Sequence, residues 1–235
     1  GIALLATGIA YFVLAGRFVL PGGAKEGITS GGDAMDYYRN LYGLDYALNE
    51  VAVPAGSPLV GKLLNEIEQP HRLRVIAMLR GSDDLRIGPG GVSRDVAVEA
   101  GCVLGLLGAP ARLQEFAEAY GLSLRQELVT FADTLAPTKA GIAEVVVPPG
   151  SRLIGKSARD VWMRKTYGLA LVALHRNGKT LREGDGIRDM PLQAGDAMVV
   201  HTPWDALARL EKNPDFVVVT TEYPHEELLP HKVRV

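Results

Sequence analysis

The sequence has very little cysteine and no excess of basic residues. Its 235 residues include a single cysteine, Cys102, so no disulfide can form within the chain, which fits a reducing compartment. Cys102 lies in the apolar stretch GCVLGLLG, a setting that favours a small buried side chain over a nucleophile or a metal ligand. The formal net charge of −2 gives no indication of a nucleic-acid polymer as a partner.

The sequence also lacks the usual patterns of catalytic residues. Its histidines have no metal-ligand spacing with Asp, Glu or Cys, so we expect no metal site. It has no nucleophile elbow with a Ser-His-Asp order, and no Gly-x-Gly-x-x-Gly follows an expected strand, as a dinucleotide-binding domain requires. We therefore expect that the chain is not an enzyme. The histidines are His71, His175, His201, His225 and His231.

An apolar segment opens the chain. The first sixteen residues, GIALLATGIAYFVLAG, carry no charge, and Arg17 follows them. This run approaches the roughly 20 residues that cross a bilayer, and a positive charge at its end is typical of the cytoplasmic flank. We predict that residues 1–21 are the end of a membrane-spanning helix, with a buried helix of a soluble domain as the alternative. Residues 22–49 read as a glycine-rich linker followed by a short amphipathic helix.

One eleven-residue motif occurs twice in the sequence. VPAGSPLVGKL begins at Val53 and VPPGSRLIGKS begins at Val147, which places the copies 94 residues apart. The same offset relates further positions, including Glu50 with Glu144 and Ala100-Gly101 with Ala194-Gly195. The homology therefore covers whole modules of the chain and is not confined to one motif.

Each copy has the pattern of a mixed helix and strand module. In the second copy, AEVVVP predicts a strand, KSARDVWMRK a short helix beginning near Ser157, and GLALVALHRNGKTLRE a hairpin that turns at Asn177-Gly178. A closing strand and the helix WDALARLEK complete the module. We predict an α+β fold of two small βαβββα modules at residues 50–122 and 144–220, joined by residues 123–143 and followed by a tail at 221–235.

The second copy of the motif also matches the consensus sequence of a nucleotide-binding P-loop. Gly150 to Ser157 reads Gly-x-x-x-x-Gly-Lys-Ser, whereas the first copy ends Gly61-Lys62-Leu63 and lacks the hydroxyl that would hold magnesium. The expected helix is short, and no later apolar strand ends in an aspartate. We favour a structural turn, in which Lys156 near a helix N-terminus offers a weak anion site. A nucleotide hydrolase that uses Gly150–Ser157 stays as the alternative.

The second copy resembles the TrkA-C domain, also called the C-terminal domain of regulators of potassium conductance. The resemblance rests on EVVVPPGSRLIGKS, GLALVALHRNGK and LQAGDAMVVHTPWDALARL, read in that order. The first copy is similar, with SDD in place of Asn-Gly and Cys102 in place of Asp196. Two such copies behind an apolar helix resemble the cytoplasmic insert of bacterial divalent-anion:sodium symporters, in which the insert lies between two membrane helices.

This resemblance implies binding residues. Relatives of the TrkA-C module dimerise, and some bind small ligands, including cyclic di-adenosine monophosphate, in a cleft between paired modules. By resemblance, the hairpin residues Arg80 and Ser82 of the first copy and His175, Arg176 and Asn177 of the second would face such a cleft. The ligand would be a cyclic dinucleotide or another anion, because arginine pairs with phosphate through two parallel hydrogen bonds. The alternative is that these are ordinary polar turn residues.

The sequence therefore predicts a non-catalytic region that regulates a membrane ion or anion transporter by sensing a ligand and by dimerising. Its partners would be the membrane-embedded part of the same polypeptide and a second copy of the chain. The modules would lie on the cytoplasmic side of the cell membrane. A purely structural dimerisation module is a further alternative, and the two modules can pair within one chain or between two chains.

Overall fold

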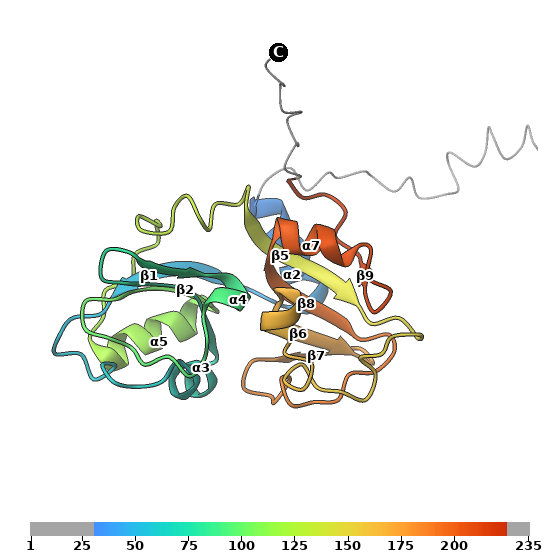
Figure 1. Ribbon diagram of the computed structural model, residues 1–235, viewed down its shortest axis with the longest axis horizontal. Helices are drawn as coiled ribbons and strands as arrows, with labels where there is room; N and C mark the ends of the chain where they lie inside the picture. Colours follow the sequence, from blue (N-terminus) through green and yellow to red (C-terminus); the bar gives the residue numbers. More distant parts are fainter. Residues whose placement is uncertain (1–30, 225–235) are drawn as a thin grey trace, which may run out of the picture.

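The computed structural model describes residues 31–224, and it shows two α+β modules side by side (Figure 1). The predicted end of a membrane helix at residues 1–21 lies outside the described residues, as do the first part of the linker and most of the tail. Within residues 31–224, no helix is long and apolar enough to cross a membrane.

The first module is a four-stranded antiparallel sheet with strand order β1-β4-β2-β3. Helices α3 and α5 contribute buried side chains to its core, which lies on one face of the sheet. Its strands and helices, which follow helix α2 (Gly31–Tyr42), are β1 (Ala47–Ala52), α3 (Leu64–His71), β2 (Leu73–Arg80), β3 (Asp84–Ile87), α4 (Gly88–Gly91), β4 (Val103–Gly108) and α5 (Pro110–Tyr120).

The second module repeats this plan and adds one short strand at the edge. Its antiparallel sheet has the order β7-β6-β8-β5-β9, so the first four strands match those of the first module. The α+β class predicted from the sequence is confirmed, and this module has the predicted βαβββα order before β9, whereas the first module has the additional short helix α4 between β3 and β4. The elements are β5 (Ala140–Val146), α6 (Met163–Tyr167), β6 (Ala170–Arg176), β7 (Lys179–Arg182), β8 (Ala197–Pro203), α7 (Trp204–Leu210) and β9 (Val217–Val218).

The repeated motif that begins at Val53 and at Val147 forms a turn in both modules. Gly61 and Gly155 have φ angles of +88° and +82°, which glycine adopts without strain. In the first module helix α3 follows at Leu64, but in the second module residues 157–162 form turns, and α6 begins only at Met163. The helix predicted from Lys156 is thus shorter and later than expected. Ser157 instead donates its hydroxyl to Asp160 Oδ2 at 2.8 Å, and the Asp160 N–H donates to Ser157 Oγ at 3.1 Å.

A third hydrophobic cluster joins the modules within one chain. Each sheet turns one face to its own helices, and the other face carries buried apolar side chains that belong to this shared cluster. The irregular positions of β2 and β6, Ile76 and Val172, are equivalent, and both side chains are buried there. Pairing within one chain, which the sequence left open, is therefore what the structure shows.

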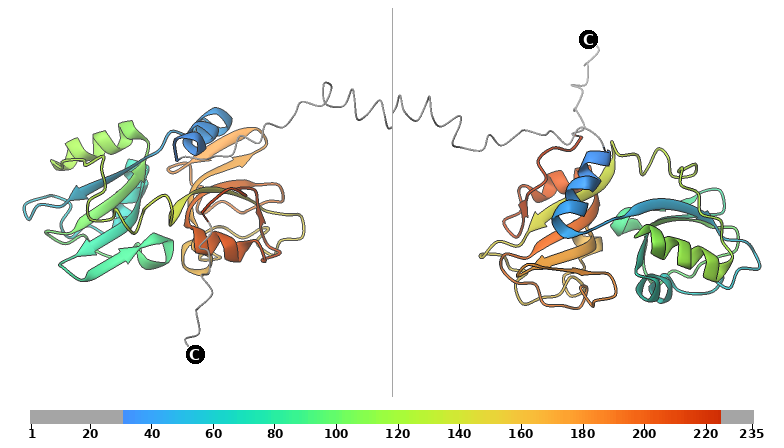
Figure 2. Two further views of the ribbon diagram at one scale, coloured as in Figure 1. Left: turned by 90° about the horizontal axis from the view of Figure 1, so that it is seen from above. Right: turned by 180° about the vertical axis from the view of Figure 1, so that it is seen from behind.

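The segment before each module packs on the other module. Helix α2 precedes the first module, yet its Tyr42 hydroxyl donates to Glu144 Oε1 of β5 at 2.6 Å. The connector (residues 123–139) precedes the second module, yet the Thr130 N–H and hydroxyl donate to Glu50 of β1 at 2.9 and 2.7 Å. Figure 2 shows α2 lying across the second module. Glu50 and Glu144 are equivalent in the repeat. The contact of α2 with the second module and the contact of the connector with the first module are therefore related in the same way as the two copies of the repeat.

One buried histidine gives the second sheet a pH dependence. His201 of β8 is 4% exposed, and burial lowers its pKa from 6.5 to about 4, with a smaller effect of Arg164 in the same direction. Below pH 6.5 this histidine binds a proton in the unfolded chain but not in the folded chain, so its own contribution to stability falls as the pH falls towards 4, by up to about 3 kcal/mol. The equivalent residue in the first module is Leu107. We expect His201→Leu to weaken this loss in urea titrations between pH 7 and pH 4, and an unchanged slope would contradict the assignment.

Candidate functional site

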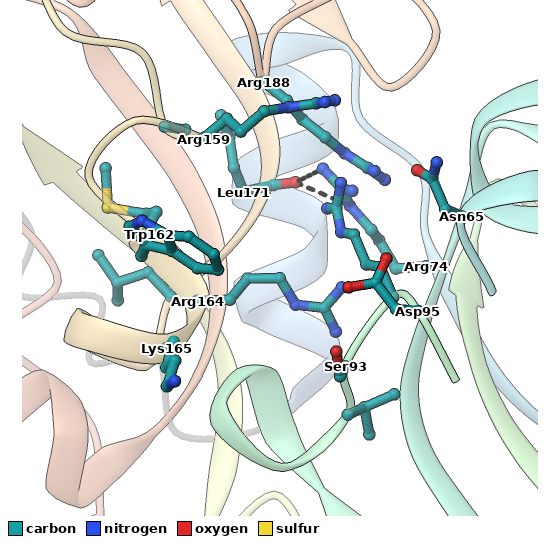
Figure 3. Close-up of a pocket in the computed structure, with 15 residues that line it drawn as sticks. Asn65, Arg74, Ser93, Asp95, Arg159, Trp162, Arg164, Lys165, Leu171 and Arg188 are labelled. Atoms are coloured by element: carbon teal, nitrogen blue, oxygen red, sulfur yellow. Dashed lines mark hydrogen bonds between the residues drawn. The ribbon is translucent and has the colours of Figure 1, made fainter. Parts of the chain in front are cut away.

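A cleft of about 350 Å³ lies between the two modules (Figure 3). The first module supplies part of α3, the start of β2 and the loop after α4, and the second supplies α6 with the turns before it, the start of β6 and the loop after β7. The wall is rich in cationic side chains from both modules: Arg74, Arg94, Arg159, Arg164, Lys165 and Arg188.

The carboxylate of Glu68 is at the centre of a network of ion pairs behind this wall of the cleft. Glu68 lies on α3, its side chain is fully buried, and its Oε1 accepts the N–H of Val75 at 2.9 Å. From the second module, Arg164 Nη1 and Arg188 Nη2 donate to Glu68 at 3.3 and 3.1 Å. From the first module, Arg94 Nε lies 3.4 Å from Glu68 Oε2, and Arg74 Nη1 lies 3.9 Å from the same oxygen. One carboxylate therefore holds four arginines, two from each module.

Two of the four arginines reflect the internal repeat, but Glu68 does not. Arg94 and Arg188 are 94 residues apart, and their carbonyl oxygens accept the N–H groups of the equivalent residues Asn65 and Arg159 at 3.1 and 3.0 Å. Between the pairs Asn65/Arg159 and Ile76/Val172 the repeat offset changes from 94 to 96, so the counterpart of Glu68 is Trp162 or Arg164, and neither is a carboxylate. Because only one of the two equivalent positions carries a carboxylate, the cleft keeps more positive charge than a symmetric pair would.

A second buried carboxylate, Glu183, balances part of this charge. Its Oε2 lies 2.5 Å from Arg74 Nη2, and its Oε1 lies 2.7 Å from Arg188 Nη2. Burial raises the pKa of Glu183 to about 7, although the Arg74 guanidinium acts in the opposite direction. Glu183 thus belongs to the same network as Glu68 and fixes the orientation of Arg74 and Arg188.

Two arginines that line the cleft each have a buried N–H group without an acceptor in the described residues. Arg74 uses Nε and Nη2 to donate to the carbonyl oxygen of Leu171. Its Nη1 is buried and has no hydrogen-bond acceptor among residues 31–224, and the same holds for Arg164 Nε. A buried donor without an acceptor costs about 1 to 3 kcal/mol. Both arginines therefore have hydrogen-bonding capacity next to the cleft that residues 31–224 do not satisfy.

The residues predicted from the sequence to bind a ligand do not line this cleft. Arg80 is paired with Asp84 and Glu99, and Arg176 with Asp196 at 2.6 Å, so each arginine is neutralised within its own module. The other four lie near the hairpins or on the surface, and the ligand role of all six stays a prediction. Ser82 is exposed, Lys156 lies in a separate depression with Arg152 and Asp215, the His175 ring lies 5.1 Å from that of Tyr42, and Asn177 occupies the left-handed turn position of its hairpin at φ +50°.

The sequence contained a signal for the residues that do line the cleft. Arg74 stands in the apolar strand LRVIAMLR, where a charge requires a partner, and Arg94 and Arg188 obey the repeat offset. Glu68 and Arg164 carried no such signal, because each has partners in the other module.

Two repeat-related α+β modules that pair around a charged cleft define a class of tandem α+β module. The chain belongs to the TrkA-C domain family, since the family model described as TrkA-C domain matches residues 48–121 and 142–214. The tandem arrangement predicted from the sequence is confirmed.

The relatives include proteins named as transporters. The chain is 30% identical over 260 residues to "Uncharacterized transporter YfbS" of Escherichia coli and 23% identical over 242 residues to "Uncharacterized transporter sll0640" of Synechocystis. It spans 40% and 37% of the length of these two proteins, and the alignments cover 99% and 100% of the chain. "Probable sodium/sulfate cotransporter 3" of Chlamydomonas reinhardtii is 36% identical over 73 residues, which are 30% of this chain and 8% of that protein.

A solved structure also resembles the chain. The crystal structure of the GsuK RCK domain is 11% identical, with a TM-score of 0.31, over 70% of this chain and 63% of that one. A likeness at this score carries no further argument.

Proposed function

We propose that the chain is the cytoplasmic regulatory region of a membrane anion transporter, inserted between two membrane-embedded parts of the same polypeptide. The transporter relatives, of which the chain matches about two fifths, support this proposal. Residues 1–21 would end one membrane helix and residues 221–235 would lead to the next. The homodimer implied by the family resemblance is part of the same proposal, as is a position of the modules on the cytoplasmic side of the cell membrane.

The observation that carries this proposal is that the two ends of the described chain meet. The Tyr38 hydroxyl of α2 lies 3.2 Å from Thr220 Oγ1, just beyond β9. Thr220 Oγ1 also accepts the N–H of Glu144 at 2.9 Å, so both ends are attached to β5. An inserted domain needs its incoming and outgoing segments close together, because both continue into the same neighbouring structure.

The crossed segments provide a route for regulation. Helix α2 leads from the N-terminal segment onto the second module, and the connector ties the second module to the first. A ligand that prefers one arrangement of the two modules would bias that arrangement by its difference in affinity. Since α2 would move with the second module, the bias would reach the membrane-embedded part.

Removing one hydroxyl should test this coupling. Tyr42→Phe deletes the 2.6 Å hydrogen bond to the buried Glu144 carboxylate, a loss of about 1 to 3 kcal/mol. We expect the full-length transporter with Tyr42→Phe to show altered sulfate uptake in vesicles, because α2 is then held less firmly on the second module.

Tyr37→Phe is the matched control for this experiment. Tyr37 lies on the same helix and donates to the same carboxylate, but its side chain is more exposed and its hydrogen bond is long, at 3.4 Å. We expect uptake close to that of the wild type. If Tyr42→Phe also transports as the wild type does, α2 does not carry regulation and the proposal is wrong.

A further inference from the structure

The charges around the cleft are not balanced by the chain itself. The guanidinium groups of Arg74, Arg94, Arg164 and Arg188 face two buried carboxylates, Glu68 and Glu183. Of the remaining charges, Arg159 is paired with Asp189, and the negative charge of Asp95, which also lines the cleft, offsets the positive charge of Lys165 in the total. An excess of two positive charges is therefore left in a largely buried place, where an unbalanced charge is costly unless an anion offsets it.

The unused donors mark where an anion would be held. Arg74 is 2% exposed and lines the cleft, and its buried Nη1 has no acceptor in the described part of the chain. Arg164 approaches from the other module, and its Nε likewise lacks an acceptor within residues 31–224. Figure 3 shows the two side chains extending towards each other from opposite walls, with Ser93 nearby. A carboxylate or phosphate between them would accept from both modules at once.

The rest of the cleft suits an apolar body. Trp162 is 68% exposed, and its backbone has a φ of +52°, a conformation that is unusual for a bulky residue. This conformation precedes α6 and places the indole on the cleft wall, where Met163 and Leu171 add apolar surface. The volume of about 350 Å³ lies at the lower end of the range for small-molecule sites, about 300 to 1,000 Å³, and exceeds what a bare sulfate or phosphate fills.

We infer that the cleft binds a small organic anion, with its carboxylate or phosphate group between Arg74 and Arg164 and its body against Trp162 and Met163. This inference rests on the proposed function, for which it names the class of ligand. Because the anion would contact both modules, its binding favours the arrangement in which the cleft is closed. A ligand without the anionic group leaves the arginines unpaired, and a bare oxyanion leaves Trp162 uncovered.

The test uses the fluorescence of Trp162 itself. The chain has two tryptophans, so Trp204→Phe leaves Trp162 as the single reporter on the cleft. The 235-residue chain is titrated with phenyl phosphate, phthalate, succinate, adenosine monophosphate and inorganic phosphate, with calorimetry as the second measurement. We expect phenyl phosphate or phthalate to change the emission and to bind at least about tenfold more tightly than inorganic phosphate. Comparison of the phosphates with the carboxylates identifies which head group the site prefers.

Two variants and one control locate the binding site. Arg164→Gln and, measured by calorimetry, Trp162→Ala should each weaken binding by about tenfold or more. Arg112→Gln, on the exposed face of α5 and paired with Glu115, should leave the affinity unchanged. Trp162 is mostly exposed, so Trp162→Ala should fold as the wild type does, and its thermal unfolding checks this.

Three outcomes would overturn the inference. These are binding by none of the five compounds at millimolar concentration, affinity for inorganic phosphate equal to that for the organic anions, and affinity that neither variant changes. In each case the arginines around Glu68 would serve only to hold the modules together. Such a result would leave the proposed function standing, because that proposal is tested by sulfate uptake with Tyr42→Phe. Conversely, normal uptake with Tyr42→Phe would leave the binding result unaffected.

Discussion

Replacing Glu68 with alanine is expected to destabilise the chain by about 3 to 5 kcal/mol, because it leaves buried arginines without their common partner. Arg74 would retain Glu183 and the carbonyl oxygen of Leu171, and Arg188 would retain Glu183. Arg164 would keep only the carbonyl oxygen of Val75. The first module would also lose the hydrogen bond from the Val75 N–H to the carboxylate. Urea denaturation followed by circular dichroism measures the free energy of unfolding.

The stability lost in Glu68→Ala should come mainly from weaker pairing of the two modules. Glu68 contributes no apolar contact to either module core, so each sheet should keep its own packing while the arginines from opposite walls repel one another. We therefore expect a second, earlier transition in the denaturation curve. Glu115→Gln is the matched control, because Glu115 is exposed on α5 and its loss should change stability by no more than about 0.5 kcal/mol. A change below about 1 kcal/mol for Glu68→Ala would mean that the network does not hold the modules together.

Much of the fold was predictable because its signals are local. The offset of 94 residues predicted two modules of one kind, and the hairpin at Asn177-Gly178 followed from residues that adopt positive φ angles. The second copy's helix was predicted too early, at Lys156. Ser157 and Asp160 there hydrogen-bond to each other and to the local backbone, which stabilises a turn in competition with a helix.

The candidate site was not predictable, because it forms between modules that the sequence could not place relative to each other. The charge of Arg74 in an apolar strand and the repeat offset of Arg94 and Arg188 were visible in the sequence, but only the fold brings Arg164 and Arg188 to a glutamate about a hundred residues away. The hairpin residues Arg80 and Arg176 had a clearer sequence pattern than the arginines of the cleft. In the structure, however, they form ion pairs with acidic residues of their own modules. Recognition of the family indicated paired modules with a ligand cleft, but it did not indicate which residues line that cleft.

The crossed segments explain why the modules stay paired without a large shared sheet. Glu50 and Glu144 lie on equivalent strands, and each accepts hydrogen bonds from the segment that leads into the other module. Each module therefore binds the segment that leads into the other module. Breaking the contact at one crossing should loosen the pair as a whole, which makes the connector a sharper test than any residue of a single module core.

Phe131→Ala in the connector is expected to cost about 3 to 5 kcal/mol, as removal of a fully buried aromatic side chain does. The ring belongs to the cluster between the modules, and it packs against Gly105 of β4, where an added Cβ would lie only 3.3 Å from its Cδ2 atom. Its own N–H also donates to Glu50, at 3.3 Å. Loss of the ring should free the connector from the first module and weaken the pairing, which urea denaturation measures.

Limited digestion with trypsin should show where the structure has loosened. Arg125 and Lys139 flank the part of the connector that crosses, so cleavage there should accelerate in Phe131→Ala, since the open form is more populated. Val129→Ala is the matched control, because Val129 is in the same segment but 69% exposed, and it should behave as the wild type. Equal digestion rates in all three proteins would show that the connector is not what holds the modules together. Faster digestion in Phe131→Ala alone would place the energy of pairing in the buried ring, because the backbone hydrogen bonds to Glu50 are the same in both variants.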